Sequence, residues 1–156
     1  KDCSNQNNCS VIVRLDYDST SFLFPGNAEK ELEKELLDDK DTKTELDTDV
    51  LKADHHGSST SNTLDFVKAV SPEIVVVSSG KRNIGTNKGY KHPQLSSLNN
   101  FNAVLKTDKY RPDQVEVFDY DKSKWVKRKT KEGIYYTKVD GDIEIVSDGR
   151  KIWKEK

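Results

Sequence analysis

The chain has 156 residues, of which 33% are hydrophobic and 34% are charged, and its formal net charge is −1. This length suits a single domain, residues 1–156, with a lean core. The near-zero net charge excludes the overall basic footprint of many nucleic-acid-binding domains, and no run of 18 apolar residues exists that would span a membrane.

The beginning of the sequence predicts a processed or truncated chain. The chain contains no methionine and starts with the polar stretch KDCSNQNNCS. Both cysteines, Cys3 and Cys9, lie in this stretch. In an oxidising compartment they would close a small loop, and in the cytosol they would remain thiols, so both states stay open.

The first predicted elements are a hairpin and a helix. Apolar and polar residues alternate over residues 11–17, as in a half-buried strand, and residues 21–24 follow after a short turn. A helix is expected over residues 28–37, with Asn27 as its N-cap. Its apolar face would consist of Ala28, Leu32 and Leu36. Residues 38–49 are so polar that only a solvated connector is expected.

The middle of the chain predicts alternating strands and helices. Ser61 or Asn62 would cap the first of these helices, and Pro93 would occupy the first position of the second. The first helix would bury Leu64, Val67 and Val70. The elements are, in order, strand 50–54, helix 63–70, strand 73–79 and helix 93–105.

The end of the chain predicts strands, over residues 114–120, 124–129, 133–139 and 142–148. Together with the preceding elements, they indicate an α/β (α+β) fold with a mixed β-sheet and flanking helices. Because open α/β sheets place their sites at the carboxyl ends of strands, the loops after Phe24, Asp54 and Ser79 are expected to meet at one edge.

Candidate site residues occur in those loops. The stretch LKADHHGSSTSN places His55 and His56 at the end of a predicted strand, and His92 ends a Gly-rich loop further on. Each histidine either belongs to a site or is an ordinary loop residue. The hydroxyls that follow the histidine pair could bind a phosphate or merely cap the next helix; they belong to Ser58, Ser59 and Thr60.

Several blocks of the sequence resemble the metallo-β-lactamase-fold domain of ComEC-type competence proteins. They are NNCSVIVRLDYDSTSFLFPGNAEKELEKELL, VLKADHHGSSTSN, IVVVSSGKRN…YKHP and DGDIEIVSDG, within residues 7–106 and 133–149. The resemblance is to the C-terminal half of that domain, which also occurs in secreted phosphorylcholine esterases. It implies half of an αββα sandwich, with residues 109–132 as a β-hairpin insertion.

The resemblance implies a metal-dependent hydrolase that acts on phosphodiesters or phosphate esters in competence and DNA uptake. His55 and His56 would be catalytic, with His56 favoured as the residue that faces the phosphate. Ser58 and Ser59 would bind substrate, and Asn8 and Ser10 match small polar residues of the family. The alternative is a catalytically inactive binding or assembly module of the same fold.

The metal site implied by the resemblance is incomplete in this sequence. His92 matches a metal ligand, whereas Asn27 stands where the family has an aspartate that bridges two metals, and an amide lacks that charge. The His-x-His-x-Asp-His block that supplies most ligands is absent. We therefore expect zinc or manganese in the intact parent, little or no metal in this chain, and no activity of this chain alone.

The resemblance also implies partners. The expected ones are the N-terminal half of the same fold or a second copy bound through the sheet face, with DNA or a phosphate ester as substrate. The expected location is extracytoplasmic or secreted, in a bacterium.

A few residues of the sequence are candidates for contacts with nucleic acid. The segment DKSKWVKRKTKEG is basic, and three cations lie in the Gly-rich loop, where they either meet a polyanion or are solvated: Lys81, Arg82 and Lys88. Four aromatic residues would stack on bases or, more commonly, pack within the sheet. They are Trp125, Trp153, Tyr135 and Tyr136.

Overall fold

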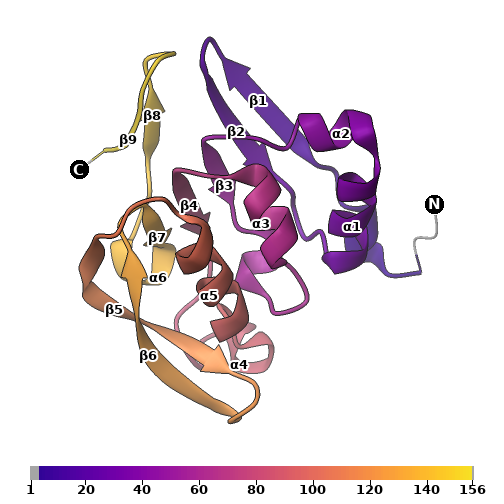
Figure 1. Cartoon of the computed structure of the whole chain (residues 1–156). Coiled ribbons are helices and arrows are strands. Elements are labelled where there is room, and N and C mark those ends of the chain that lie inside the picture. Colours follow the sequence, from indigo (N-terminus) through magenta and orange to yellow (C-terminus); the bar gives the residue numbers. More distant parts are fainter. Residues whose placement is uncertain (1–3, 156) are drawn as a thin grey trace.

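The computed structural model describes residues 4–155 and is built on a mixed five-stranded sheet (Figure 1). The strand order is β1–β2–β3–β4–β7. β1 and β2 are antiparallel, and β2, β3, β4 and β7 run parallel to one another. The strands span Val13–Tyr17, Thr20–Phe24, Val50–Lys52, Ile74–Val77 and Ile134–Tyr136. The predicted mixed α/β class, with a mixed sheet and flanking helices, is thereby confirmed.

Helices and two further hairpins complete the fold. The longer helices are α1 (Lys30–Asp38), α3 (Leu64–Val70) and α5 (Leu95–Val104). The short ones are α2 (Lys40–Thr44), α4 (Asn87–Tyr90), α6 (Thr137–Asp140) and the 3-10 turns η1 (Gln6–Cys9) and η2 (Asp54–Gly57). Separate hairpins are formed by β5 (Tyr110–Asp119) with β6 (Lys124–Lys131), and by β8 (Ile145–Ser147) with β9 (Ile152–Lys154).

The core lies between one face of the sheet and the helices α3 and α5. The sheet contributes Leu23, Leu51, Val75, Val77, Ile134 and Tyr136. The helices contribute Phe66, Val67, Val70, Leu98 and Phe101. The β5–β6 hairpin adds Val115 and Val117, so it packs into the core rather than standing apart from it. Tyr136 is 1% exposed, and its candidate role in stacking on bases is therefore wrong.

Two helices begin later than the sequence predicted. The N-cap of α1 is Glu29, so the prediction that Asn27 caps this helix is wrong. The cause is a turn in which the Ala28 N–H donates to the Pro25 carbonyl at 3.2 Å, which carries the chain past Asn27 before the helix starts. The N-cap of α5 is Gln94, so Pro93 lies outside the helix.

The helix α3 begins one residue later than the sequence predicted. Thr63 is the N-cap, and its side chain accepts a hydrogen bond from the Phe66 N–H. The predicted burial of Val67 and Val70 is confirmed, since both are 0% exposed. The predictions that Ser61 or Asn62 caps this helix and that Leu64 is buried are wrong, because the cap is Thr63, and because Phe66, rather than the 37% exposed Leu64, completes the buried face.

The predicted connector, residues 38–49, has structure of its own. Asp39 caps the short helix α2, since its side chain accepts a hydrogen bond from the Thr42 N–H at 2.9 Å. Leu46 is 2% exposed and joins the core. The interpretation of this segment as a solvated connector and nothing more is therefore wrong.

The second face of the sheet is apolar, and its part formed by β1 and the end of β2 is open. On β1, which was expected to be half-buried, Val13, Leu15 and Tyr17 are 49%, 54% and 53% exposed. Phe24, the register partner of Val13 on β2, is 43% exposed. None of the helices within residues 4–155 combines the length and apolar character needed to cross a membrane.

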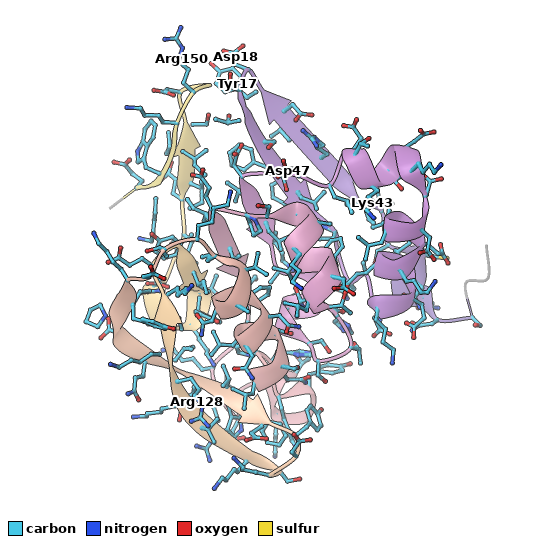
Figure 2. All side chains as sticks on the ribbon, viewed as in Figure 1. Tyr17, Asp18, Lys43, Asp47, Arg128 and Arg150 are labelled. Atoms are coloured by element: carbon cyan, nitrogen blue, oxygen red, sulfur yellow. The ribbon has the colours of Figure 1, made fainter. Side chains whose placement is uncertain are left out.

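The β8–β9 hairpin reaches this open face only at its margins. The Ser147 hydroxyl lies 2.7 Å from that of Thr20 at the end of β2, and the tip of the hairpin approaches the β1–β2 turn (Figures 1 and 2). At the other side, the Lys154 ammonium lies 5.6 Å from the centre of the Tyr135 ring. Between these contacts the apolar side chains of β1 stay exposed.

Candidate functional site

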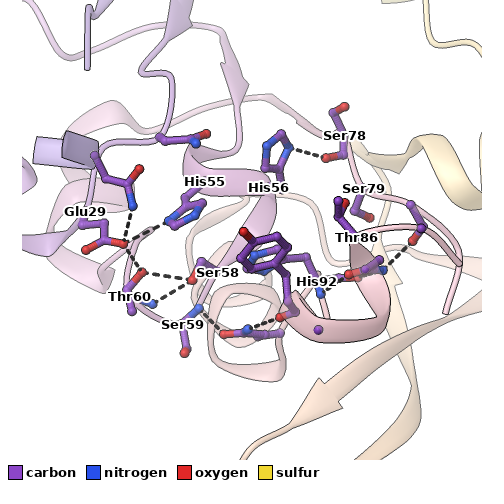
Figure 3. Close-up of a pocket in the computed structure, with 18 of the residues that line it drawn as sticks. Glu29, His55, His56, Ser58, Ser59, Thr60, Ser78, Ser79, Thr86 and His92 are labelled. Atoms are coloured by element: carbon purple, nitrogen blue, oxygen red, sulfur yellow. Dashed lines mark hydrogen bonds and ion pairs between the residues drawn. The ribbon is translucent and has the colours of Figure 1, made fainter. Parts of the chain in front are cut away.

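A cavity of about 710 Å³ opens where β2, β3 and β4 end (Figure 3). Its lining includes Asn27 from the loop after β2, His55 and His56 from η2, and His92 from the loop before α5. The three loops therefore meet at the carboxyl edge of the sheet, as predicted from the strand order. We call this cavity the histidine pocket.

The turn that carries the paired histidines has an unusual backbone. His55, His56 and Gly57 have φ values of 43°, 58° and 79°, all in the left-handed region that costs side-chain-bearing residues about 1 kcal/mol or more each. The turn is anchored by the His55 N–H, which donates to the Gly26 carbonyl at 3.1 Å. A Cβ at position 57 would lie 3.0 Å from that of Pro93, so only glycine fits there.

The three imidazole rings form a triangle within the histidine pocket. The ring centres of His55 and His92 are 5.4 Å apart, those of His56 and His92 are 6.2 Å apart, and those of His55 and His56 are 6.4 Å apart. Three rings this close can contact one small ligand. They cannot all be protonated at little cost, because like charges at this distance repel one another.

His56 is oriented by a backbone carbonyl. Its Nδ1 lies 2.8 Å from the Ser78 oxygen, and because a carbonyl only accepts hydrogen bonds, Nδ1 carries the proton. The neutral ring then has its lone pair on Nε2. Burial lowers the pKa of His56, and the charge of Lys52 adds to this effect, so the neutral form is favoured.

His92 is the most buried of the three, at 7% exposed. Its backbone is held on both sides by the Asn87 side chain, and its ring stacks on Tyr90 with centres 6.0 Å apart. Its Nδ1 has no hydrogen-bond partner within residues 4–155. Burial, with His55 and His56 nearby, lowers its pKa to about 4, so His92 is neutral at pH 7.

His55 is paired with a carboxylate that the sequence did not single out. The Oε1 atom of Glu29 lies 3.1 Å from the His55 Nδ1. Burial raises the pKa of Glu29, but hydrogen bonds from Asn5, Asn7 and Thr60 outweigh this and bring it below its ordinary value. Glu29 thus favours its ionised form, and its charge lies beside the His55 ring. In the sequence it is simply the second residue after Asn27, within a predicted helix.

The hydroxyl-rich loop after the histidines is mostly engaged within the protein. The Ser58 hydroxyl, which is buried, lies 3.0 Å from that of Thr60, and Thr60 in turn donates to Glu29 at 3.1 Å. Ser59 is exposed at the pocket rim and its N–H donates to the Gln94 side chain. Of the two predicted substrate-binding residues, Ser59 is the more accessible.

Asn27 lines the pocket and is held through its backbone. Its N–H donates to the Ser10 hydroxyl at 3.1 Å, and Asn8 accepts from the Glu29 N–H at 3.3 Å. The two small polar residues near the start of the chain therefore position the Asn27–Glu29 segment. Cys3 lies outside the described residues, and so does its pairing with Cys9.

The positions of the side chains show whether the described residues could bind a metal ion. Within residues 4–155, no group of three or more His, Cys, Asp or Glu side chains is arranged to hold a metal ion. His92 offers a buried, unpartnered nitrogen, but Asn27 offers only a neutral amide. The described residues therefore do not form a divalent-metal centre by themselves.

A pair of fully buried carboxyl groups lies behind the histidine turn. Glu33 and Asp54 are both 0% exposed. Glu33 accepts hydrogen bonds from the N–H groups of Asn62 and Thr63, and the carboxyl group of Asp54 interacts with that of Glu33. Burial and the charge of Glu33 raise the pKa of Asp54 well above its ordinary value.

Comparison with known proteins places the chain next to competence proteins. It is 31% identical over 111 residues to ComE operon protein 3 of Bacillus subtilis, a match that covers 69% of this chain and 13% of that protein. It is 33% identical over 108 residues to competence protein ComA of Neisseria gonorrhoeae, covering 67% and 15% respectively. No protein-family model and no solved structure matches it. By sequence, the chain is thus homologous to a segment of ComEC-type competence proteins that makes up 13% and 15% of these two relatives.

Proposed function

We propose that the histidine pocket binds the phosphate group of a phosphodiester or phosphate ester. In this proposal it forms one side of the active site of a longer, metal-dependent hydrolase connected with competence and DNA uptake. The observation that carries it is the convergence of His55, His56 and His92 in one cavity. Imidazole and hydroxyl groups can donate hydrogen bonds to phosphate oxygens, and the names of the relatives connect the segment with competence.

His55 and His56 have different hydrogen-bonding surroundings, and we therefore propose different catalytic roles for them. His55, backed by the carboxylate of Glu29, suits the donation of a hydrogen bond or proton to an anionic oxygen. His56, with its Nδ1 proton held by Ser78, suits the acceptance of a proton at Nε2. The described residues do not form a metal centre, so the metal ligands of the proposed hydrolase come from elsewhere in the longer protein.

Binding of a small phosphodiester to this chain tests the proposal directly. We expect bis(p-nitrophenyl) phosphate to bind, and His56→Ala to weaken binding by roughly tenfold, which is about the value of one hydrogen bond to a charged group. Isothermal titration calorimetry is the measurement. Lys43→Ala, on α2 away from the pocket (Figure 2), is the control. Equal affinity of the wild type and His56→Ala would refute the proposal.

Glu29→Gln is expected to weaken the same binding without unfolding the chain. The variant keeps the size of the side chain but loses the charge beside His55 and one of the two oxygens that accept hydrogen bonds, so roughly a tenfold loss is expected. Nitrogen NMR of the His55 ring should show a changed distribution of the two tautomers. Glu73→Gln, at an exposed position just before β4, is the matched control. An unchanged tautomer in Glu29→Gln would exclude the orienting role.

A second candidate function is a binding or assembly module without catalysis, and the amide at Asn27 favours it. Under both candidates, we expect this chain alone to show no phosphodiesterase turnover with added Mn²⁺ or Zn²⁺, because residues 4–155 contain no group of three or more His, Cys, Asp or Glu side chains placed to hold a metal ion. Turnover that is lost in His56→Ala would contradict this. In the longer protein, Asn27→Asp should tighten metal binding, measured by metal analysis, and raise activity if the hydrolase proposal holds.

A further inference from the structure

Lys138, on α6, lines a second cavity of about 710 Å³, which the proposed function does not use. This cavity is bounded by the loop after β4, the β5–β6 hairpin and α6. Its other lining side chains are Lys81, Arg82, Ile84, Gln114, Glu116, Lys127 and Val139. We call it the α6 cavity.

The amine of Lys138 is held in place and shielded from water. It donates a hydrogen bond to the backbone carbonyl of Glu116 on β5, and it lies 5.2 Å from the centre of the Trp125 ring on β6. The side chain is half-buried and still lines the α6 cavity. The amine is therefore fixed at the cavity wall, where a small molecule within the cavity can reach it.

The charged neighbours of this amine do little to favour its ammonium form. Glu116 lies 3.6 Å from Arg82, and Asp140, on the same helix as Lys138, is paired with Arg111. Both carboxylates thus already have a cationic partner. The remaining charged side chains around the α6 cavity are positive and disfavour a further ammonium. They are Lys81 and Lys127.

Lys138 is therefore a nucleophile at mildly alkaline pH. Burial lowers its pKa to about 8, with the charge of Glu116 acting in the opposite direction. A lysine in water has a pKa of about 10.4. At pH 8 about half of the Lys138 side chains are thus neutral, against fewer than about 1% of lysines in water, and only the neutral amine can attack a carbonyl carbon.

We propose that Lys138 is an acylation site whose donor is a small acyl phosphate bound in the α6 cavity. The phosphate would lie against Arg82 and Lys127, since guanidinium and ammonium groups suit a dianion. The Lys138 nitrogen forms a bond to the acyl carbon, and the bond from that carbon to the phosphate oxygen breaks, so that phosphate leaves with the electron pair. The proton that the amine loses passes to the departing phosphate. The product is an uncharged amide, and the histidine pocket takes no part in its formation.

The test measures acetylation of individual lysines by acetyl phosphate, with mass spectrometry of the resulting peptides. At pH 8, Lys138 should react roughly tenfold faster than Lys43 or more. Lys43 is an exposed lysine on α2, away from the α6 cavity (Figure 2). The rate at Lys138 should rise with pH and level off above its pKa of about 8. Lys138→Arg, which keeps the charge, should remove this modification.

A second donor tests the role of the cations. p-Nitrophenyl acetate has no phosphate group, so Lys127→Gln should leave its reaction with Lys138 nearly unchanged. The same variant should slow the reaction with acetyl phosphate by roughly threefold to fivefold, the value of one exposed charge contact. Lys124→Gln, on the same strand but outside the cavity lining, is the matched control. Lys124 and Lys127 are both exposed, so neither variant should disturb the fold.

The outcomes decide between a native acylation site and general lysine reactivity. Equal rates at Lys138 and Lys43, or the same preference for Lys138 after unfolding in urea, would overturn the proposal. Equal slowing of both donors in Lys127→Gln, or no slowing of either, would overturn the assignment to an acyl phosphate. A preference confined to the native chain, with selective slowing of acetyl phosphate, would support it. None of these results bears on ligand binding at the histidine pocket.

Discussion

Replacing Asp54 by asparagine is expected to raise the free energy of unfolding at neutral pH and to flatten its dependence on pH. Asp54 is fully buried, and the carboxyl group of Glu33 lies beside its own. A second negative charge in such a place is costly, so burial and the neighbouring Glu33 favour the protonated form of Asp54. Asparagine has the same shape and no proton to lose.

The sign of the pH dependence follows from the raised pKa of Asp54. In the unfolded chain, the carboxyl group loses its proton near its ordinary pKa of about 3.9. Above that pH the folded state binds more protons than the unfolded state, so wild-type stability is greatest below it and falls as the pH rises toward the folded pKa. One proton corresponds to a slope of about 1.4 kcal/mol per pH unit.

Urea unfolding between pH 4 and 7 measures this effect. Burial also raises the pKa of Glu33, so the two carboxyl groups titrate as a coupled pair. The wild type should lose stability across this range, whereas Asp54→Asn should lose less and exceed the wild type at pH 7. Asp65→Asn, an exposed position in the first turn of α3, is the control. Parallel curves for the wild type and Asp54→Asn would disprove the buried proton.

The open face of the sheet should make this chain associate, either with itself or with a partner sheet. Exposed apolar patches beyond a few hundred Å² are uncommon on soluble monomers, and Val13, Leu15, Tyr17 and Phe24 are exposed together on this face. A stable contact would bury roughly 800 Å² per chain. Light scattering over a dilution series should therefore show a species larger than the monomer.

A matched pair of leucines provides the control for this experiment. Leu15 is 54% exposed on the open face, and Leu64 is 37% exposed on α3. Leu15→Lys should shift the equilibrium toward monomer, while Leu64→Lys should leave it unchanged. A wild-type chain that stays monomeric at every concentration would mean that the β8–β9 hairpin, with its contacts at Thr20 and Tyr135, suffices to protect the face.

Local patterns predicted the elements well and their ends poorly. The apolar run at residues 73–79 located β4, and the alternation at residues 11–17 located β1. The prediction that β1 is half-buried was wrong, because alternation indicates that one face of a strand is apolar but not that another element covers this face. The prediction that Asn27 caps α1 was wrong because a turn, closed by a hydrogen bond to the Pro25 carbonyl, precedes the helix. The periodicity of apolar residues in the helix does not indicate such a turn.

The candidate site was predicted as a set of loops and not as a set of contacts. The carboxyl-edge rule brought His55, His56 and His92 together from loops far apart in the sequence. The partner of His55 could not be predicted, because Glu29 looks like any acidic residue at the start of a helix. Its role depends on Asn5 and Asn7, whose polar stretch carried no signal of its own.

The left-handed turn at His55 and His56 has a consequence for how these positions respond to selection. Asparagine and glycine adopt this backbone at lower cost than histidine. A library sorted for thermal resistance alone should therefore drift away from histidine at both positions, even though the fold is unchanged. A library sorted for ligand capture should return to histidine and accept a less robust protein. If histidine is retained at these positions although it destabilises the fold, the reason is a requirement of function and not of folding.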